Sequence, residues 1–161
     1  MKKITFLSNS VTQVFNSSFL NYQVNHLEIN TIPQVLLSKL ETDYLIIIID
    51  YRYFSIDGQL TIDSIDLADN FIGLVKKFRE ANNSKIIISN IFNCIAHINP
   101  KIDNEQHNIL FEINNKLCDL SNIQGLAILD VFNLCMLKGF EVIFNLKNAY
   151  LVGSTDIMLD K

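Results

Sequence analysis

A chain of 161 residues falls within the size of one domain, and at this length folding buries roughly 68–70% of the surface that an unfolded chain exposes. The formal net charge is −4 and the basic residues are dispersed, which argues against nucleic-acid binding because a polyanion requires a clustered positive footprint. The longest strongly apolar run, 44–49, is far shorter than the about 20 residues that cross a bilayer, so we expect no membrane insertion.

Five short apolar runs predict the strands of one sheet. In chain order they are Ile4–Leu7, Val24–Ile29, Tyr44–Asp50, Lys85–Ser89 and Leu126–Phe132. The third and fourth are continuous rather than alternating, which is typical of strands covered on both faces in a parallel sheet. We expect these two and the first run to be central, with the second run toward one edge.

Segments with helical spacing of apolar residues separate these runs. The first covers 11–19, and the second follows Pro33 and covers 35–40. The third begins near Ser64, which we expect to be its N-cap, and ends at Asn82 and Asn83. Its apolar face is formed by Leu67, Phe71, Leu74, Val75 and Phe78. The fourth runs from about Asp103 to Leu120, with Ile109, Leu110, Ile113 and Leu117 on its apolar face.

This alternation of strand and helix predicts a three-layer α/β/α sandwich with a five-stranded parallel sheet, in the order 2-1-3-4-5. No repeat or proline-rich linker divides residues 1–161, so we expect a single domain. The pattern weakens after Phe132, where 142–144 is a candidate short strand. We expect 148–161 to be a tail or a linker to another domain of a longer parent protein.

The cysteines and the start of the chain bear on the compartment. Cys94, Cys118 and Cys135 have neither CxxC nor His-paired spacing, and we expect buried free thiols rather than disulfides or a zinc site. Met1-Lys2-Lys3 imitates the basic start of a signal peptide, but polar residues 8–10 interrupt the apolar run that should follow. The sequence therefore predicts a cytoplasmic protein.

Candidate ligand-binding residues follow the apolar runs, because ligands of open parallel sheets bind beyond the carboxyl ends of the strands. The segments at these positions are polar: Ser8-Asn9-Ser10, Asn30-Thr31, Asp50-Tyr51-Arg52, Ser89-Asn90 and 130–133. From them we expect Ser8, Asn9, Asp50 and Arg52 to contact a substrate. No cluster of acids, thiols or imidazoles predicts a metal, and we expect no cofactor.

The first of these segments carries a resemblance. Ile4-Thr5-Phe6-Leu7-Ser8-Asn9-Ser10 resembles the first strand and turn of SGNH-hydrolase-like domains, in particular the amino-terminal domain of FkbH-like proteins. The SGNH turn reads Gly-Asp-Ser, so Ser10 occupies the position of the nucleophile, while Ser8 and Asn9 replace Gly and Asp. The segments 44–52, 129–131 and 149–151 resemble the third strand with Asp-x-Arg, the last core strand and the closing segment of the FkbH-like domain.

The departures from the SGNH pattern concern catalysis. That family has a Gly-x-Asn-Asp block after the third strand and an Asp-x-x-His pair near the carboxyl end, whereas this chain has Asp50-Tyr51-Arg52 and no His after His107. A serine hydroxyl needs an adjacent base to become a nucleophile. His97 could supply that base only if its loop folded back over Ser10. A serine that opens a helix is also a standard N-cap, so Ser10 has a purely structural interpretation as well.

Asp50 permits another comparison, with response-regulator receiver domains, whose phosphorylated Asp ends the third strand of a sheet with the same order. That chemistry needs an acidic pair after the first strand and a Lys after the fifth, and this chain has Asn9 and no Lys near Asp130. A degenerate receiver-like signalling domain is therefore a remote alternative. An ion pair or a loop hydrogen bond is the structural interpretation of Asp50 and Arg52.

The resemblance implies a domain with degenerate catalytic motifs that binds an acyl or glyceryl group, an acyl carrier protein or a neighbouring catalytic domain in a biosynthetic pathway. The phosphatase-like chemistry of FkbH-like proteins resides in a haloacid-dehalogenase-type domain with an Asp-x-Asp start, and no such motif occurs in this sequence. The alternative is a serine ester hydrolase or acyltransferase. In it Ser10 is the nucleophile, Asn90 or Asn9 is the oxyanion donor, and His97 is the base.

Overall fold

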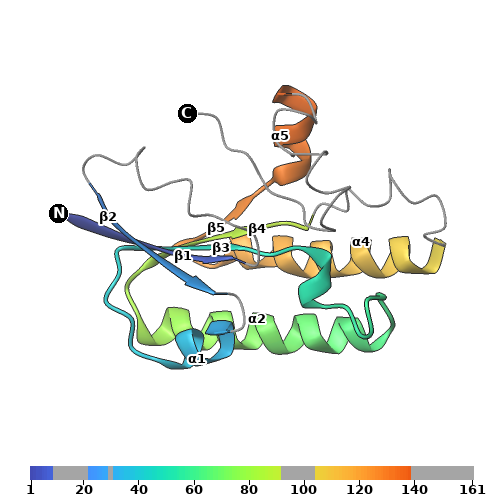
Figure 1. The fold of residues 1–161 in the computed structure, drawn as a ribbon, viewed down its shortest axis with the longest axis horizontal. Coiled ribbons are helices and arrows are strands. Elements are labelled where there is room, and N and C mark those ends of the chain that lie inside the picture. The colour runs from blue at the N-terminus through green and yellow to red at the C-terminus, as the bar shows by residue number, and fades with distance from the viewer. Residues whose placement is uncertain (9–21, 29–30, 92–103, 139–161) are drawn as a thin grey trace.

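A computed structural model describes residues 1–8, 22–28, 31–91 and 104–138 of the chain (Figure 1). Five parallel strands form one sheet in the order β2-β1-β3-β4-β5. Their bounds are β1 Lys2–Ser8, β2 Tyr22–Glu28, β3 Tyr44–Ile48, β4 Lys85–Ser89 and β5 Leu126–Leu129. The predicted α/β fold and strand order are confirmed, with β1, β3 and β4 central and β2 at one edge.

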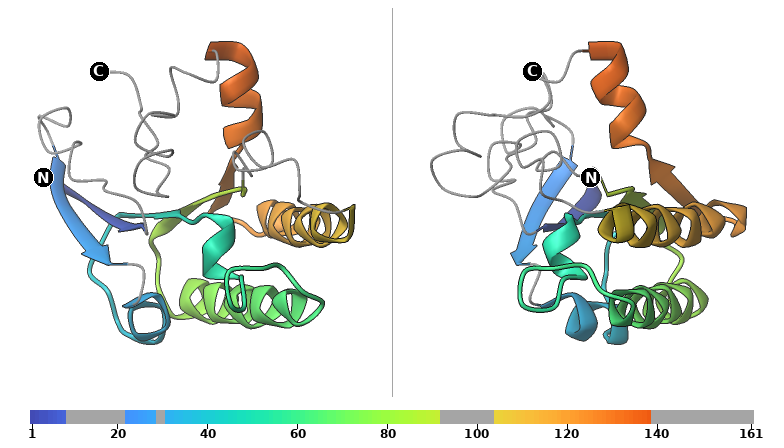
Figure 2. Two further views of the ribbon diagram at one scale, coloured as in Figure 1. Left: turned by 45° about the vertical axis from the view of Figure 1, so that its right-hand side comes forward. Right: turned by 90° about the vertical axis from the view of Figure 1, so that its right-hand side faces the viewer.

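The helices are α1 Ile32–Leu37, α2 Asp63–Ala81, α4 Asn104–Asp119 and α5 Val131–Lys138, with short 3-10 turns η3 Tyr51–Tyr53 and η4 Leu120–Asn122. Helices α2 and α4 connect neighbouring strands, α1 connects β2 to β3 on the far side of β1, and α5 follows β5. Helices α1 and α2 lie on one side of the sheet and α5 lies on the other (Figures 1 and 2). Helices α2 and α4 are neighbours, and the Lys116 ammonium on α4 contacts the Asp69 carboxylate on α2 at 2.9 Å.

The predictions for the end of the last strand and for the N-cap of α2 are wrong. The apolar run 126–132 is not one strand, because β5 ends at Leu129 and α5 begins at Val131. Ser64 is not the N-cap of α2, which begins at Asp63 after Ile62. Ser64 is buried within the first turn, and its Oγ accepts a hydrogen bond from the backbone N–H of Thr61 at 3.0 Å. The hydroxyl therefore bonds a residue that precedes the helix rather than a backbone N–H of its first turn.

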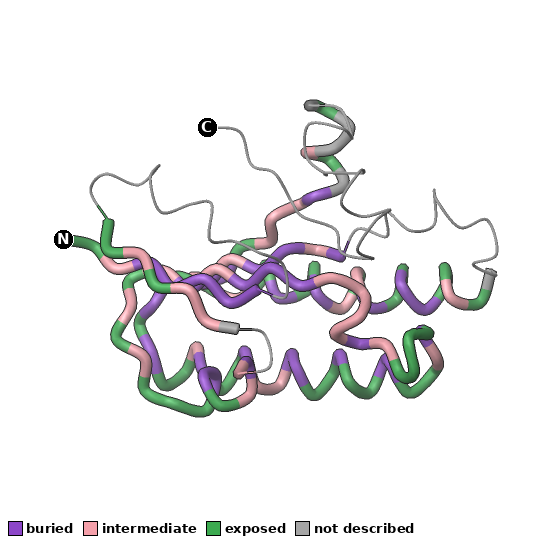
Figure 3. The backbone as a smooth tube through the Cα atoms, in the orientation of Figure 1, coloured by how far each residue is buried: buried purple, intermediate pink, exposed green. Residues whose placement is uncertain are grey.

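The main core fills the space between the sheet and the helices α1, α2 and α4. Alternate strand residues such as Leu7, Leu45 and Ile47 point into it, and the buried segments follow the central strands (Figure 3). Seven residues of the predicted apolar faces of α2 and α4 are buried, whereas Leu67 is exposed: the buried ones are Phe71, Val75, Phe78, Ile109, Leu110, Ile113 and Leu117. A smaller cluster on the opposite face contains Ile4, Phe6 and Ile48.

The structure tests only part of the remaining predictions. Cys118 is exposed on α4, so the expectation that this thiol is buried is wrong. The predicted helix 11–19, the strand 142–144, the tail 148–161 and Cys94 lie outside the described residues. Within the described part of the chain, no helix is long and apolar enough to cross a membrane.

Candidate functional site

The candidate site is the carboxyl edge of the sheet, which we define as Ser8, Asp50, Arg52, Asn90 and Asp130. These residues end or follow β1, β3, β4 and β5. Ser8 is the last residue of β1, is buried, and lies in register with Ile48 of β3. The parallel register therefore brings the ends of separate strands together at one edge, as the sequence predicts.

Asp50 and Arg52 form an ion pair at the end of β3. One carboxylate oxygen of Asp50 accepts the backbone N–H of Arg52 at 2.9 Å, and the other accepts the guanidinium Nε–H at 2.9 Å and an Nη2–H. The Asp50 side chain is 15% exposed and that of Arg52 is 36% exposed. The carboxylate thus starts the 3-10 turn and holds a partly exposed guanidinium at the edge of the sheet, as the structural interpretation of this pair expects.

The end of β4 is fixed to both neighbouring strands. Ser89 Oγ is buried and accepts the backbone N–H of Ile49 at 3.1 Å, which links β4 to the chain just after β3. On the other side, Asn90 Nδ2 donates to Asp130 Oδ1 at 2.9 Å, and Asn90 Oδ1 accepts the backbone N–H of Val131 at 2.8 Å. The amide of Asn90 therefore has one orientation, set by two partners that follow β5.

Asp130 caps helix α5. Its Oδ1 accepts the backbone N–H of Asn133 at 3.0 Å, and its Oδ2 accepts the side-chain amide of the same residue. A carboxylate that accepts an N–H in the first turn of a helix stabilises the helix terminus. Asp130 is therefore both the N-terminal cap of α5 and the partner of Asn90.

Asn114 on α4 is a positioning residue that the sequence did not indicate. Its Oδ1 accepts the backbone N–H of Ile91 at 2.7 Å, and its Nδ2 donates to the carbonyl of Ile91 at 2.9 Å. Both backbone groups of the residue after Asn90 are thus satisfied by one side chain. The feature of the sequence that could have indicated this role is the polar amide that follows the buried Ile113 in an amphipathic helix.

Of the residues to which the hydrolase alternative gives a catalytic role, the structure describes Asn90. Asn9, Ser10 and His97 lie outside the described residues. His26 lies within β2 and stacks on Phe6, with ring centroids 5.4 Å apart, and burial lowers its pKa from the usual 6.5. His107 is exposed on the first turn of α4.

The thiol of Cys118 is a poor candidate nucleophile. Although the residue is exposed, partial desolvation of its thiol, followed by the negative charges of Asp130 and Asp119, raises the pKa of this thiol above its usual value. Because the thiolate is the reactive form, a raised pKa lowers nucleophilicity near neutral pH. The described carboxyl edge contains the partly exposed guanidinium of Arg52, which can donate to a polar ligand, and it contains no histidine.

Comparisons with known proteins support the same fold. No protein-family model and no curated protein sequence matches this chain. The chain is structurally similar to the N-terminal part of the protein BF1531 from Bacteroides fragilis, a crystal structure that contains a phosphatase domain and is complexed with Mg. The TM-score is 0.68 at 18% sequence identity. The two proteins share a fold. The similarity covers 99% of this chain and 47% of the other, so this chain spans about half the length of its structural neighbour.

Proposed function

We propose that this chain is a binding domain related to the amino-terminal domain of FkbH-like proteins. In this proposal the carboxyl edge binds an acyl or glyceryl group that a carrier protein presents, and the domain acts beside a phosphatase-type catalytic domain. In this proposal the domain does not cleave the bond between that group and the carrier protein. The domain positions a substrate for chemistry that another domain performs.

The extent of the structural similarity supports a role beside a phosphatase domain. The neighbour contains a phosphatase domain, and the similar region makes up 47% of that chain. This sequence has no Asp-x-Asp motif, which the phosphatase-like domain of FkbH-like proteins carries at its start. The comparison therefore supports assigning this chain to a part of such an assembly other than the phosphatase-like domain.

The bond between Asn90 and Asp130 is the observation that favours binding over hydrolysis. In the hydrolase alternative, Asn90 or Asn9 donates a hydrogen bond to the oxyanion of the transition state, and of these two residues the structure describes Asn90. Its Nδ2 lies 2.9 Å from Asp130 Oδ1, so an oxyanion bound by this amide would form beside an existing carboxylate. Two negative charges at such a separation repel each other, and an oxyanion hole requires donors without a competing anion.

The binding role predicts that Arg52 contributes to ligand affinity, because its guanidinium is partly exposed at the edge and donates several hydrogen bonds. We expect an acyl or glyceryl thioester on a carrier protein to bind with a saturable heat in calorimetry, and Arg52→Gln to weaken that binding. Lys77→Gln removes one positive charge on the exposed face of α2 and is the matched control. The proposal would be overturned if the wild type and both variants bound the loaded carrier protein with equal affinity. It would also be overturned if the wild type bound the unloaded carrier protein as tightly as the loaded one.

Covalent labelling distinguishes the binding role from a serine hydrolase. We expect no labelling of the wild-type protein by a fluorophosphonate, because a serine without a base is not activated. Labelling that disappears in Ser10→Ala would establish an activated serine and favour the hydrolase or acyltransferase. Loss of the label in His97→Ala as well would identify the base. Mass spectrometry of the intact protein measures both results.

A further inference from the structure

A row of alternating tyrosines and lysines crosses the amino ends of the strands, at the edge opposite the carboxyl edge. Tyr22 of β2 lies in register with Lys2 of β1, and Tyr44 of β3 lies in register with Lys85 of β4. The rings of Tyr22 and Tyr44 meet edge to face, with centroids 6.4 Å apart. Four strands therefore contribute one side chain each to a single row.

Two ammonium groups in this row converge on one ring. Nζ of Lys2 lies 5.7 Å and Nζ of Lys85 lies 5.9 Å from the centroid of Tyr44. The neighbouring Lys3 has a carboxylate partner, Glu41, at 3.6 Å. Neither Lys2 nor Lys85 forms an ion pair with any described residue. Two like charges beside one ring repel each other, and an anion between them would remove that repulsion.

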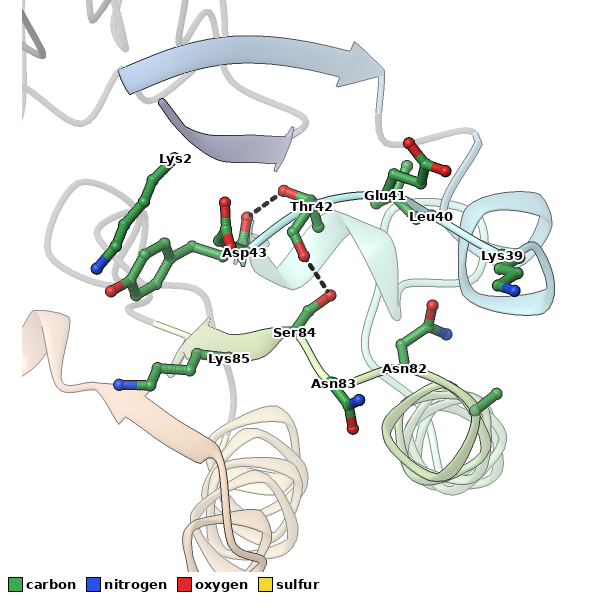
Figure 4. A pocket seen from close by; sticks show the side chains of 12 residues that line it. Lys2, Lys39, Leu40, Glu41, Thr42, Asp43, Asn82, Asn83, Ser84 and Lys85 are labelled. Carbon is green, nitrogen blue, oxygen red and sulfur yellow. Dashed lines mark hydrogen bonds between the residues drawn. The ribbon is translucent and has the colours of Figure 1, made fainter. Parts of the chain in front are cut away.

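A pocket of about 450 Å³ adjoins the row. This volume is within the range of small-molecule sites, about 300–1,000 Å³. The side chains of Lys2 and Lys85 extend in the same direction at one side of the pocket, and Lys39 lies at the other side (Figure 4). The pocket is therefore large enough for a small molecule, with two cations at one end.

The two acidic residues that line the pocket already have partners. Asp43 Oδ2 accepts the backbone N–H of Lys3 at 2.7 Å, and Glu41 pairs with the ammonium of the same residue at 3.6 Å. These carboxylates are thus oriented toward Lys3. The charges of Lys2 and Lys85 are left for a ligand.

We propose that this pocket binds the phosphoryl group of a small phosphorylated molecule, with Lys2 and Lys85 as its charged donors and the Tyr44 ring as the surface that positions both. A phosphate dianion balances two ammonium groups, whereas a carboxylate balances one. The site lies at the amino ends of the strands and is independent of the function proposed for the carboxyl edge. Because both lysines are exposed, affinity should fall as ionic strength rises.

The test is a titration of the full chain with inorganic phosphate at low salt, followed by backbone amide NMR. We expect saturable shifts at residues 2, 44 and 85 with a dissociation constant in the millimolar range, and weaker shifts with acetate. The double variant Lys2→Gln/Lys85→Gln should bind phosphate on the order of tenfold more weakly, because it removes both charge-assisted hydrogen bonds. Shifts that do not saturate, or that acetate reproduces in full, would overturn the proposal.

Two further variants separate a specific site from general attraction to positive charge. Lys76→Gln/Lys77→Gln removes the same charge from the exposed face of α2 and should retain wild-type affinity. Tyr44→Leu retains both lysines but removes the ring, and should weaken binding several-fold. An equal loss in the α2 variant, or wild-type affinity in Tyr44→Leu, would contradict the site. Circular dichroism establishes that each variant is folded before binding is compared.

Discussion

Asn90 and Asp130 follow neighbouring strands and are joined by a hydrogen bond of 2.9 Å from Nδ2 to Oδ1. The same amide accepts the backbone N–H of Val131 at 2.8 Å, while the carboxylate accepts the N–H of Asn133 at 3.0 Å. One side chain at the end of β4 is thereby connected to the first turn of α5. This arrangement accounts for the immediate change from strand to helix after Leu129 and makes Asn90 a structural residue of the edge.

Asn90→Ala should lower the free energy of unfolding by about 1–3 kcal/mol, because it removes the acceptor of the Val131 N–H and one of the hydrogen bonds that Asp130 Oδ1 accepts. Urea unfolding followed by circular dichroism measures this change. Asn122→Ala, at an exposed position in η4, is the matched control and should stay within about 0.5 kcal/mol of wild type. Equal effects of the two substitutions would show that the Asn90 network does not stabilise the fold.

Substitution by alanine at two glycines should change the stability of the protein in opposite directions. Gly125 has a φ of +87°, and a Cβ there would lie 2.7 Å from Nη2 of Arg79, whose guanidinium donates to the carbonyls of Gln124 and Asn82. We expect Gly125→Ala to destabilise the protein by about 1–2 kcal/mol or more. Gly73 lies inside α2, where a Cβ meets no atom within 4 Å. Gly73→Ala should stabilise by roughly 0.5–1 kcal/mol. Thermal unfolding of both variants tests the pair, and a stabilising Gly125→Ala would contradict the contact with Arg79.

The fold could be predicted because its signals are local. The continuous apolar runs that form β3 and β4 and the helical spacing of Phe71, Val75 and Phe78 are visible within short windows of sequence. The start of α5 was not predicted, because Val131 extends an apolar run and only the side chain of Asp130 marks the end of the strand. Apolar runs alone cannot locate such a boundary, since β-branched residues also begin helices.

The candidate site could be predicted only as a set of positions. The rule for parallel sheets placed Asp50 and Asn90 at one edge, and the structure places both there. The partners of Asn90 lie 40 and 41 residues away in the sequence, so neither the bond to Asp130 nor the bond to Val131 has a local signal. Asn114 bonds Ile91 across 23 residues, so the sequence has no local signal for this contact either. The roles of Ser10 and His97 remain predictions.

His26 should make stability depend on pH. Burial beside Phe6 lowers its pKa from 6.5, so the folded protein holds this side chain neutral at pH values where the unfolded chain already binds a proton. Its contribution to stability is therefore present above about pH 6.5 and is lost as the pH falls toward the lower pKa of the folded state. The loss of unfolding free energy between about pH 7 and about pH 5 should be smaller in His26→Gln than in wild type. Urea unfolding at both pH values measures it, and an identical pH dependence would contradict the shift.

Millimolar Mg²⁺ should leave the melting temperature unchanged. The carboxylate of Asp50 is bound by Arg52, and that of Asp130 accepts hydrogen bonds from Asn90 and Asn133. Among the described residues, no three His, Cys, Asp or Glu side chains are grouped as a metal site would require. Mg²⁺ needs carboxylates that can replace some of its water ligands, and these two would first have to give up their present partners.

Thermal unfolding in the presence of Mg²⁺ tests this prediction. A bound ion present at a concentration of about 100 times its dissociation constant would stabilise the fold by roughly 2.7 kcal/mol, which raises the melting temperature by several degrees. A saturable rise that Asp50→Asn abolishes would refute the prediction and revive the receiver-like alternative, whose chemistry depends on that aspartate.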